Sequence, residues 1–284
     1  MSASCEVYAP SDLKTALHLK SRYRDDLHVV AGGTLSVRLM SANAIETKNL
    51  MLLERLPLSF IRVSGRNVQI GAMTRLIDLI DNRLPKALVL AARSVRGLSI
   101  KSMATVGGNV FSPSPGCDVA TALMALDAHL TLQSMNRKRS VPLEKFYRGP
   151  LKYSIRSNEL VAMITVRNPP QYSTFTKLTP LPNSGPTIAS VAIALDVNKR
   201  EIVRRASVAV GGITTHPYRA KYVERFMLNK KLSNITLDQV EQGLVPKGLT
   251  IIKDANASSE YRERMVPVLF MRALNSLVKE VSRR

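Results

Sequence analysis

The sequence feature that most restricts how this chain can fold is a pair of adjacent glycines, Gly107-Gly108, within the turn-rich segment 105–118. The segment precedes the apolar run 119–126, which predicts a loop leading into a helix with Asp118 as its N-cap. Adjacent glycines let the backbone approach a bulky ligand without a Cβ in the way, and successive N–H groups in such a turn favour an anion. An isolated glycine pair, however, usually marks only a surface turn. Three short polar side chains lie on this segment: Ser112, Ser114 and Asp118.

A second glycine pair, Gly32-Gly33, makes the first more informative. It follows the apolar run 27–31, which has the composition of a short strand, and Thr34 comes directly after it. Main-chain amides and a hydroxyl at the end of that strand are suited to phosphate oxygens. Neither glycine segment contains G-x-G-x-x-G or G-x-x-x-x-G-K-S/T, which argues against a Rossmann domain and a nucleoside triphosphatase. We therefore expect the two segments to clasp one long diphosphate ligand.

Helix and strand signals alternate along the first 170 residues, and Pro169-Pro170 marks a boundary. We expect strands at 27–31, 45–53, 59–63, 67–72, 128–133 and 159–166, and helices that begin near residue 12, at 85–95 and at 118–126. Thr74 is expected to cap a further helix through Ile80. Beyond Ser173, segments 187–196 and 201–210 predict an antiparallel hairpin, followed by helices at 217–227, 236–244 and 258–281.

Composition narrows the choice of function. The chain has 284 residues, 45% of them apolar, which suffices for one large or two to three small subdomains. Its net charge of +20 predicts an anionic partner or simply a basic, solvated surface. No zinc-finger spacing or basic helix before heptads supports sequence-specific nucleic-acid binding. The two cysteines, Cys5 and Cys117, cannot hold an iron–sulfur cluster, which needs about four thiolates.

Other classes of site and setting have no sequence support either. The four histidines are scattered without metal-ligand spacing, and no Ser/His/Asp or Cys/His set stands out, so we expect no metal site and no catalytic residue. The N-terminal residues lack the apolar region of a secretory signal. No apolar run approaches the roughly 20 residues that a membrane helix needs. We expect no membrane span and a reducing, cytoplasmic setting.

The ordered motifs resemble the FAD-binding medium subunit of molybdenum hydroxylases, the xanthine dehydrogenase and carbon monoxide dehydrogenase family. The motifs that carry the resemblance cover nearly the whole chain: Ala31-Gly32-Gly33-Thr34, Ile70-Gly71-Ala72, Thr105-Val106-Gly107-Gly108-Asn109, Ser114-Pro115 with Asp118, Ala125-Leu126-Asp127-Ala128, Leu143-Glu144-Lys145-Phe146, Phe175-Thr176-Lys177, Gly211-Gly212, Pro217-Tyr218-Arg219-Ala220 and Tyr261-Arg262. The resemblance implies an α+β fold, with two N-terminal α+β subdomains of the PCMH-like FAD-binding type and a C-terminal subdomain of antiparallel sheet plus helices. The corresponding domains are 1–170, divided into about 1–55 and 56–170, and 171–284.

The resemblance also implies which residues bind FAD. Its first diphosphate segment corresponds to Val29, Val30, Ala31, Gly32, Gly33, Thr34, Leu35 and Ser36, and its second to Ala104, Thr105, Gly107, Gly108 and Asn109. Further flavin or ribityl contacts correspond to Ser112, Asp118 and a backbone group near Val161. Lys177 corresponds to a lysine beside the flavin, where a positive charge would stabilise the anionic reduced form; the alternative is an exposed strand lysine. Two residues depart from the family pattern: Leu35 stands where Asp is common, and Phe111 where a small residue is usual.

The function implied is an oxidoreductase subunit that transfers electrons. Electrons would come from a molybdopterin-containing large subunit through a 2Fe–2S small subunit to FAD on this chain, and then to NAD, a quinone, a carrier or oxygen. The holoenzyme's substrate is then not encoded in this chain. Two alternatives stay open: a free-standing flavin oxidoreductase with its own substrate, and a basic nucleic-acid-binding or scaffold protein that kept the fold without FAD.

Overall fold

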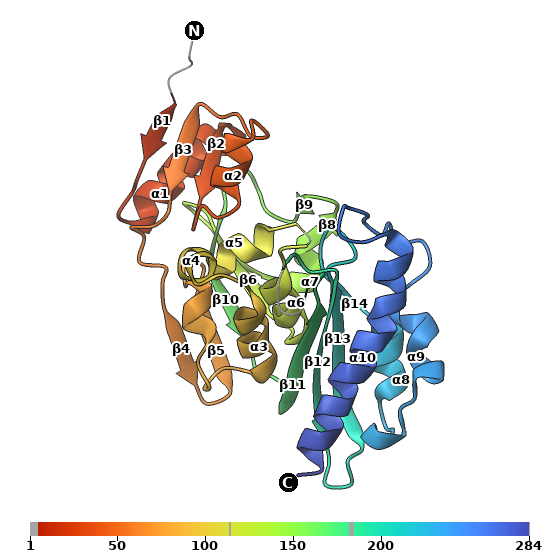
Figure 1. Ribbon diagram of the computed structural model, residues 1–284. Helices are drawn as coiled ribbons and strands as arrows, with labels where there is room; N and C mark the ends of the chain where they lie inside the picture. The colour runs from red at the N-terminus through yellow and green to blue at the C-terminus, as the bar shows by residue number, and fades with distance from the viewer. Residues whose placement is uncertain (1–4, 114, 182–184, 284) are drawn as a thin grey trace.

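The computed structural model describes residues 5–113, 115–181 and 185–283 (Figure 1). In these residues the strands form a three-stranded sheet, a five-stranded sheet, a four-stranded sheet and a two-stranded ribbon. Helices cover the sheets, so the chain has the predicted α+β fold. None of the helices in this described part has the length and apolar character of a membrane-spanning segment.

The N-terminal unit is a small parallel sheet with the strand order β1-β3-β2. Its elements are β1 (Glu6–Tyr8), α1 (Leu13–Tyr23), η1 (Arg24–Asp26), β2 (Leu27–Val30), α2 (Ser36–Ser41) and β3 (Asn49–Leu52). Asp12 caps α1 by accepting a hydrogen bond from the Thr15 amide at 2.9 Å, as its place after Pro10-Ser11 predicts. The apolar face of α1 packs on the sheet through Ala16 and Leu17.

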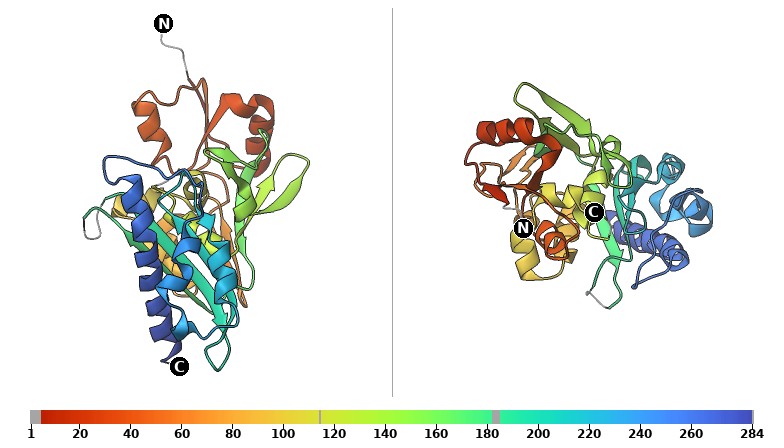
Figure 2. Two further views of the ribbon diagram at one scale, coloured as in Figure 1. Left: turned by 90° about the vertical axis from the view of Figure 1, so that its right-hand side faces the viewer. Right: turned by 90° about the horizontal axis from the view of Figure 1, so that it is seen from above.

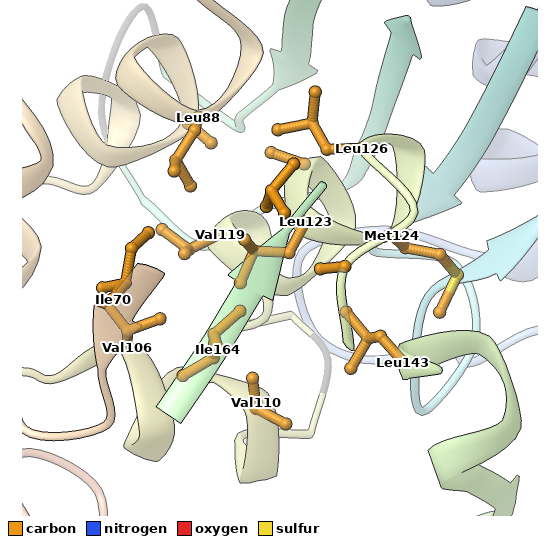
Figure 3. Packing of buried hydrophobic residues seen from close by; sticks show 14 of the residues in the cluster. Ile70, Leu88, Val106, Val110, Val119, Leu123, Met124, Leu126, Leu143 and Ile164 are labelled. Atoms are coloured by element: carbon orange, nitrogen blue, oxygen red, sulfur yellow. The ribbon is translucent and has the colours of Figure 1, made fainter. Parts of the chain in front are cut away.

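The five-stranded sheet is antiparallel, with the order β4-β5-β10-β6-β7. Its strands are β4 (Ile61–Ser64), β5 (Asn67–Gly71), β6 (His129–Gln133), β7 (Lys138–Pro142) and β10 (Leu160–Val166). Between them lie η2 (Leu76–Leu79), α3 (Lys86–Ser94), α4 (Leu98–Met103), α5 (Val106–Phe111), α6 (Asp118–Ala125), α7 (Leu143–Phe146), β8 (Tyr147–Gly149) and β9 (Lys152–Tyr153). Figure 3 shows Ile164 of the sheet, Val106 and Val110 of α5, and Leu123 of α6 meeting in one core.

The C-terminal unit is an antiparallel sheet in the order β11-β12-β13-β14, with helices on its outer face. The strands are β11 (Tyr172–Leu178), β12 (Ala189–Val197), β13 (Val203–Gly211) and β14 (Tyr218–Arg219), and the predicted hairpin is β12–β13. The helices are α8 (Lys221–Met227), η3 (Leu232–Asn234), α9 (Leu237–Leu244) and α10 (Ser259–Val281). The N-terminal unit and helices α8–α10 lie on opposite sides of the molecule (Figure 2).

The two larger sheets enclose a layer of helices. Helices α3 and α6 pack on the inner face of the four-stranded sheet, and α10 packs on its outer face. Strand β12 shows why both faces are covered: Ala192 and Ala194 point into the core shared with α6, whereas Val191 and Ile193 point into the core under α10. Small side chains on the inner face bring α6 close to the sheet. A strand buried on both faces has continuous rather than alternating hydrophobicity.

Three local predictions outside the glycine segments are wrong. The helix predicted at 217–227 begins only at Lys221, because Tyr218 and Arg219 form β14 beside β13. Thr74 caps no α-helix, because its hydroxyl donates to the Phe60 carbonyl at 2.9 Å and accepts from the Phe60 amide at 3.1 Å. The segment that follows is the short 3₁₀ helix η2, which has no side-chain cap. Asp118 is the first residue of α6 rather than its N-cap, which is Cys117. The carboxylate of Asp118 instead binds partners in the C-terminal unit, as described below.

Candidate functional site

The two glycine segments lie against each other. A Cβ atom on Gly32 would stand 1.9 Å from the carbonyl oxygen of Met103, at the end of α4, so only glycine permits this contact. A Cβ on Gly108 would stand 3.9 Å from the Cβ of Ala31, which is ordinary van der Waals contact. The tertiary structure therefore brings residues 31–32 and 103–108 together, although about 70 residues separate them in the sequence.

The first glycine segment offers a row of backbone donors. Among the described residues, the N–H groups of Gly32, Gly33, Thr34 and Leu35 donate to no protein acceptor. Gly33 has a φ of +72°, a conformation that favours glycine, and its carbonyl accepts from Val37 at 3.0 Å to begin α2. The segment is half-buried. Consecutive unbonded N–H groups of this kind form a concavity suited to an anion.

The second glycine segment is different from the prediction, because it is the first turn of a helix and not an open anion-binding loop. Thr105 caps α5, and its hydroxyl accepts from the Gly108 amide at 3.1 Å. The amides of Val106 and Gly107 donate to the carbonyls of Thr74 and Ala72 at 2.9 and 2.8 Å. Gly107 is needed for this close packing, since a Cβ there would stand 2.8 Å from the Ala72 carbonyl oxygen. The residues just after β5 thus accept from the donors that this segment was expected to offer to a ligand.

One donor of the second segment stays without a protein acceptor. Thr105 is only 3% exposed, and within the described chain its N–H donates to no protein atom. An isolated bridge pairs Thr105 with Arg75, and the two hydrogen bonds beside it use the amides of Leu76 and Val106 instead. Buried backbone donors without a partner are rare in folded proteins. Within the described residues, this is the backbone donor of the second segment that a bound ligand could use.

Asn109 connects the second segment to α6. Its side-chain amide donates to the Gly116 carbonyl at 2.8 Å and accepts from the Ala120 amide at 3.0 Å. The carbonyl oxygen and the amino group of this side chain are therefore both bonded within the protein. A cofactor contact by the Asn109 side chain would have to replace or share one of these bonds. These two hydrogen bonds join α5 to the segment before α6 and to its first turn.

Asp118 and Lys177 form a buried ion pair. The ammonium of Lys177, on β11, lies 2.8 Å from the carboxylate of Asp118, and the two side chains are 11% and 6% exposed. Thr187, just before β12, donates its hydroxyl to both carboxylate oxygens, at 2.9 and 3.1 Å. The interpretation of Lys177 as an exposed strand lysine is therefore wrong. The pair also neutralises the charge that was expected to act on the flavin alone.

Two tyrosines that the sequence interpretation missed hold the end of α5. Tyr147 donates to the Val110 carbonyl at 2.8 Å and Tyr153 to the Phe111 carbonyl at 3.0 Å, so they cap helix carbonyls that lack a partner in the helix. Burial raises the pKa of Tyr147 well above its ordinary value and also raises the pKa of Tyr153, which keeps both hydroxyls as donors. Phe111 packs edge-on against Tyr153. The sequence signal that could have located these residues is the pair of tyrosines six positions apart in the segment that forms the β8–β9 hairpin.

The remaining predicted residues lie at the edges of this arrangement. Val29 and Val30 belong to β2, and Ala104 is buried at the end of α4. Ser112 follows α5, with its hydroxyl 3.4 Å from the Pro113 carbonyl, whereas Ser114 lies outside the described residues. Val161 lies at a register shift of β10, where bulges commonly re-aim the backbone. Ser36 is the first residue of α2.

No group of three or more His, Cys, Asp or Glu side chains in the described residues is arranged to hold a metal ion. The buried Cys117 lies one residue before Asp118, and Cys5 is exposed on the N-terminal unit.

Comparison with known proteins gives two family matches that together span most of the chain. Residues 3–169 match the FAD binding domain in molybdopterin dehydrogenase, and residues 183–277 match the CO dehydrogenase flavoprotein C-terminal domain. The glyceraldehyde dehydrogenase medium chain of Sulfolobus acidocaldarius is 29% identical over 258 residues, which cover 89% of this chain and 91% of that one. The carbon monoxide dehydrogenase medium chain of Hydrogenophaga pseudoflava is 30% identical over 166 residues, which cover 57% of this chain and 58% of that one.

Solved structures show the same fold. A chain of Cu,Mo-CO dehydrogenase in its cyanide-inactivated form superposes with a TM-score of 0.88 at 24% identity, covering 97% of this chain and 98% of that one. A chain of the carbon monoxide dehydrogenase of Hydrogenophaga pseudoflava that lacks the Mo-pyranopterin moiety superposes with a TM-score of 0.86 at 25% identity, covering 96% of each.

Proposed function

This chain belongs to the family of FAD-binding medium subunits of molybdenum hydroxylases, and on that premise we propose that it carries electrons from iron–sulfur clusters on a partner to an acceptor outside the complex. Its cofactor is FAD, and it is a component of an oxidoreductase. The observation that carries the proposal is the row of unbonded N–H groups at residues 32–35, with the buried N–H of Thr105 beside it.

These donors fit the diphosphate of FAD. A diphosphate needs several donors in a row and no nearby carboxylate, and segment 29–36 contains no acidic residue. In this proposal the amides of Gly32, Gly33, Thr34 and Leu35 bind phosphate oxygens, and Thr105 adds one further donor. Gly107, Gly108 and Asn109 shape the neighbouring wall. When bound, FAD supplies the electron transfer that protein side chains cannot perform.

The Lys177–Asp118 pair is proposed to face the flavin. A lone ammonium would attract the anionic reduced flavin strongly, whereas an ion pair presents only a dipole. The protein then controls the potential through the position and orientation of that dipole. Ser112 and the backbone near Val161 are proposed as further contacts, and Tyr147 and Tyr153 position α5 without touching the cofactor.

The partners proposed are a molybdopterin-containing large subunit and a 2Fe–2S small subunit. The relatives named above are medium chains, a term for one component among several. With two cysteines this chain cannot hold a cluster of four thiolates, so the clusters must lie elsewhere. The external acceptor is NAD, a quinone, a carrier or oxygen.

The proposal is tested by the visible absorption spectrum of the purified full chain before and after addition of FAD. Gly33→Ala is the informative variant, because it puts a side chain at a φ of +72° within the row of donors. Gly65→Ala is the matched control: Gly65 has a φ of +56° and lies in open space, so the backbone strain is similar, about 1 kcal/mol.

We expect wild type and Gly65→Ala to show stoichiometric flavin bands. Gly33→Ala is expected to have the same thermal stability as Gly65→Ala but to bind FAD at least about tenfold more weakly, which is about 1.4 kcal/mol of binding free energy. A colourless, folded wild-type protein whose nucleic-acid affinity falls steeply with salt would instead support the scaffold alternative. Equal FAD affinity in all three proteins would exclude the first glycine segment as the diphosphate site.

A further inference from the structure

A chain of buried polar contacts runs from the candidate cofactor site into the C-terminal helix. Thr187 donates its hydroxyl to Asp118, and its own carbonyl accepts from a terminal nitrogen of Arg262 at 3.3 Å. The same guanidinium nitrogen donates to the carbonyls of Ile188 at 2.6 Å and Gly212 at 2.9 Å. Arg262 therefore joins the start of β12 to the end of β13.

Arg262 is buried completely, with 0% of its surface exposed, near the start of α10. Its other terminal nitrogen lies 2.7 Å from a carboxylate oxygen of Asp254. Burying a guanidinium is costly unless it is paired and hydrogen-bonded, and here it has an ion pair and three carbonyl acceptors. A single apolar side chain would fill the same space at lower cost, so packing alone does not explain the arginine.

Gly212 makes the contact possible. It has a φ of +81°, and a Cβ there would stand 3.0 Å from the Cγ2 atom of Thr187. Glycine thus allows the end of β13 to approach the residue whose hydroxyl reaches Asp118. Along the contact chain the four charges alternate in sign, in the order Lys177, Asp118, Arg262 and Asp254, with Thr187 between Asp118 and Arg262.

We propose that Arg262 is a positioning residue for the cofactor site, which holds Thr187 so that its hydroxyl donates to the Asp118 carboxylate. This inference rests on the proposed function, because it assumes that the Lys177–Asp118 pair faces the flavin. The polar contacts of Arg262 are with Thr187, Ile188, Gly212 and Asp254, so among the described residues it bonds to neither member of the pair. Its effect passes through Thr187 alone.

The Thr187 hydrogen bond matters because it disperses the negative charge of Asp118. Without that donor the carboxylate exerts a stronger negative field and disfavours the anionic reduced flavin. Thr187→Val removes the hydroxyl but keeps the carbonyl that Arg262 binds. Arg262→Lys keeps the charge, but a single ammonium cannot satisfy three carbonyls and Asp254 at once.

The test uses the full chain with FAD bound and measures the flavin reduction potential by spectroelectrochemistry. Thr187→Val is expected to weaken the preference for reduced over oxidised flavin about tenfold, which is a decrease of about 30 mV for a two-electron couple. Arg262→Lys is expected to act in the same direction. The potential of the double variant should shift no further than that of the larger single variant, because both changes act on the same hydrogen bond, from Thr187 to Asp118.

Two controls separate positioning from general damage. Thr187→Ser keeps the hydroxyl and is expected to keep the wild-type potential. Arg219→Lys alters another arginine whose side chain is only 6% exposed. It pairs with Asp127, just beyond the opposite end of α6, and with Glu224 of α8, and the change is expected to lower stability without changing the potential. In the flavin-free chain, Arg262→Lys should also speed hydrogen exchange of the Ile188 amide, which donates to Leu178 at 2.8 Å.

A wild-type chain that binds FAD with a potential insensitive to Thr187→Val and Arg262→Lys would overturn this inference and leave the proposed function intact. Additive shifts in the double variant would overturn it as well, since Arg262 would then act by another route. A folded wild-type chain that binds no FAD would overturn the proposed function, and the inference with it.

Discussion

At the scale of single residues, Lys177 and Asp118 form a buried ion pair, which in the proposed site changes the effect of the lysine's charge on the flavin. An isolated lysine would raise the affinity for the reduced cofactor, but this lysine has a carboxylate 2.8 Å away. Removing one partner of a buried pair leaves the other uncompensated, which costs more than the pair contributes. The proposed function therefore predicts that changing the pair alters stability and flavin potential together.

Lys177→Met is expected to leave the Asp118 carboxylate buried with Thr187 as its remaining side-chain donor. We expect the unfolding free energy to fall by about 3 kcal/mol and the flavin potential to become more negative, measured by urea unfolding and spectroelectrochemistry. Lys86→Met is the matched control, because Lys86 pairs with Glu280 at 2.8 Å on the surface and should cost less than about 1 kcal/mol. An unchanged potential in Lys177→Met would place the pair away from the flavin.

His216 stacks on Tyr147 with ring centroids 5.2 Å apart, and burial lowers the pKa of its imidazole below the ordinary 6.5. The folded state thus resists protonation more than the unfolded state does. Its contribution to stability is complete above pH 6.5 and is lost as the pH falls through the lower folded pKa. We expect urea unfolding to show stability falling as the pH decreases below 6.5, with a shallower slope in His216→Phe. Equal slopes in the two proteins would contradict the assignment.

At the scale of elements, α5 is held at both ends by groups from distant parts of the chain. Its N-terminal amides bind the carbonyls of Thr74 and Ala72, and its C-terminal carbonyls accept from Tyr147 and Tyr153. A six-residue helix has little stability of its own, so these contacts determine that it forms. The glycine pair serves this packing as well as the candidate site.

Gly107→Ala tests the packing of α5 on β5. The new Cβ would stand 2.8 Å from the backbone oxygen of Ala72, which cannot move without disturbing the sheet. We expect a loss of about 1–3 kcal/mol in thermal or urea unfolding. The control is Gly108→Ala in the same helix, where the nearest atom is the Thr105 side-chain hydroxyl at 3.1 Å and the loss should be smaller. The reverse order of losses would show that α5 is not fixed by this contact.

At the scale of the whole molecule, the layer of helices between the two larger sheets makes the N-terminal and C-terminal units depend on each other. All eight residues of α6 are buried, and one core cluster includes residues of α6 together with Phe175 and Ala192 of the four-stranded sheet. Ion pairs cross the same boundary, from Lys177 to Asp118 and from Lys221 to Glu144.

A fragment of residues 1–170 is therefore expected not to fold as a stable domain, although the proposed domain boundary lies there. Without the four-stranded sheet, α3 and α6 would expose apolar surface. We expect the fragment to bind a hydrophobic dye and to unfold without a cooperative transition, measured by fluorescence and circular dichroism. The full chain serves as the control. Cooperative unfolding of the fragment would show that the first two sheets and their helices suffice.

The sequence by itself indicated many of the helices and strands and their order. Local signals located the Asp12 cap of α1, the β12–β13 hairpin and the helices near the C-terminus, because caps, turns and periodic hydrophobicity depend on neighbouring residues. The ordered motifs also led to the α+β fold, the family and FAD, since glycine at close approaches is visible in a sequence even when its contact is not.

Only the tertiary structure decided how the polar groups are used. Whether an amide is open to a ligand depends on acceptors that are distant in sequence. Ala72 and Thr74 accept from Gly107 and Val106 of the second glycine segment, whereas the amides of residues 32–35 have no acceptor among the described residues. The partners of Asp118 come from Lys177 and Thr187, at least 59 positions away. Hydrogen bonds and ion pairs form between groups that folding brings within about 3 Å, and no local pattern encodes that distance.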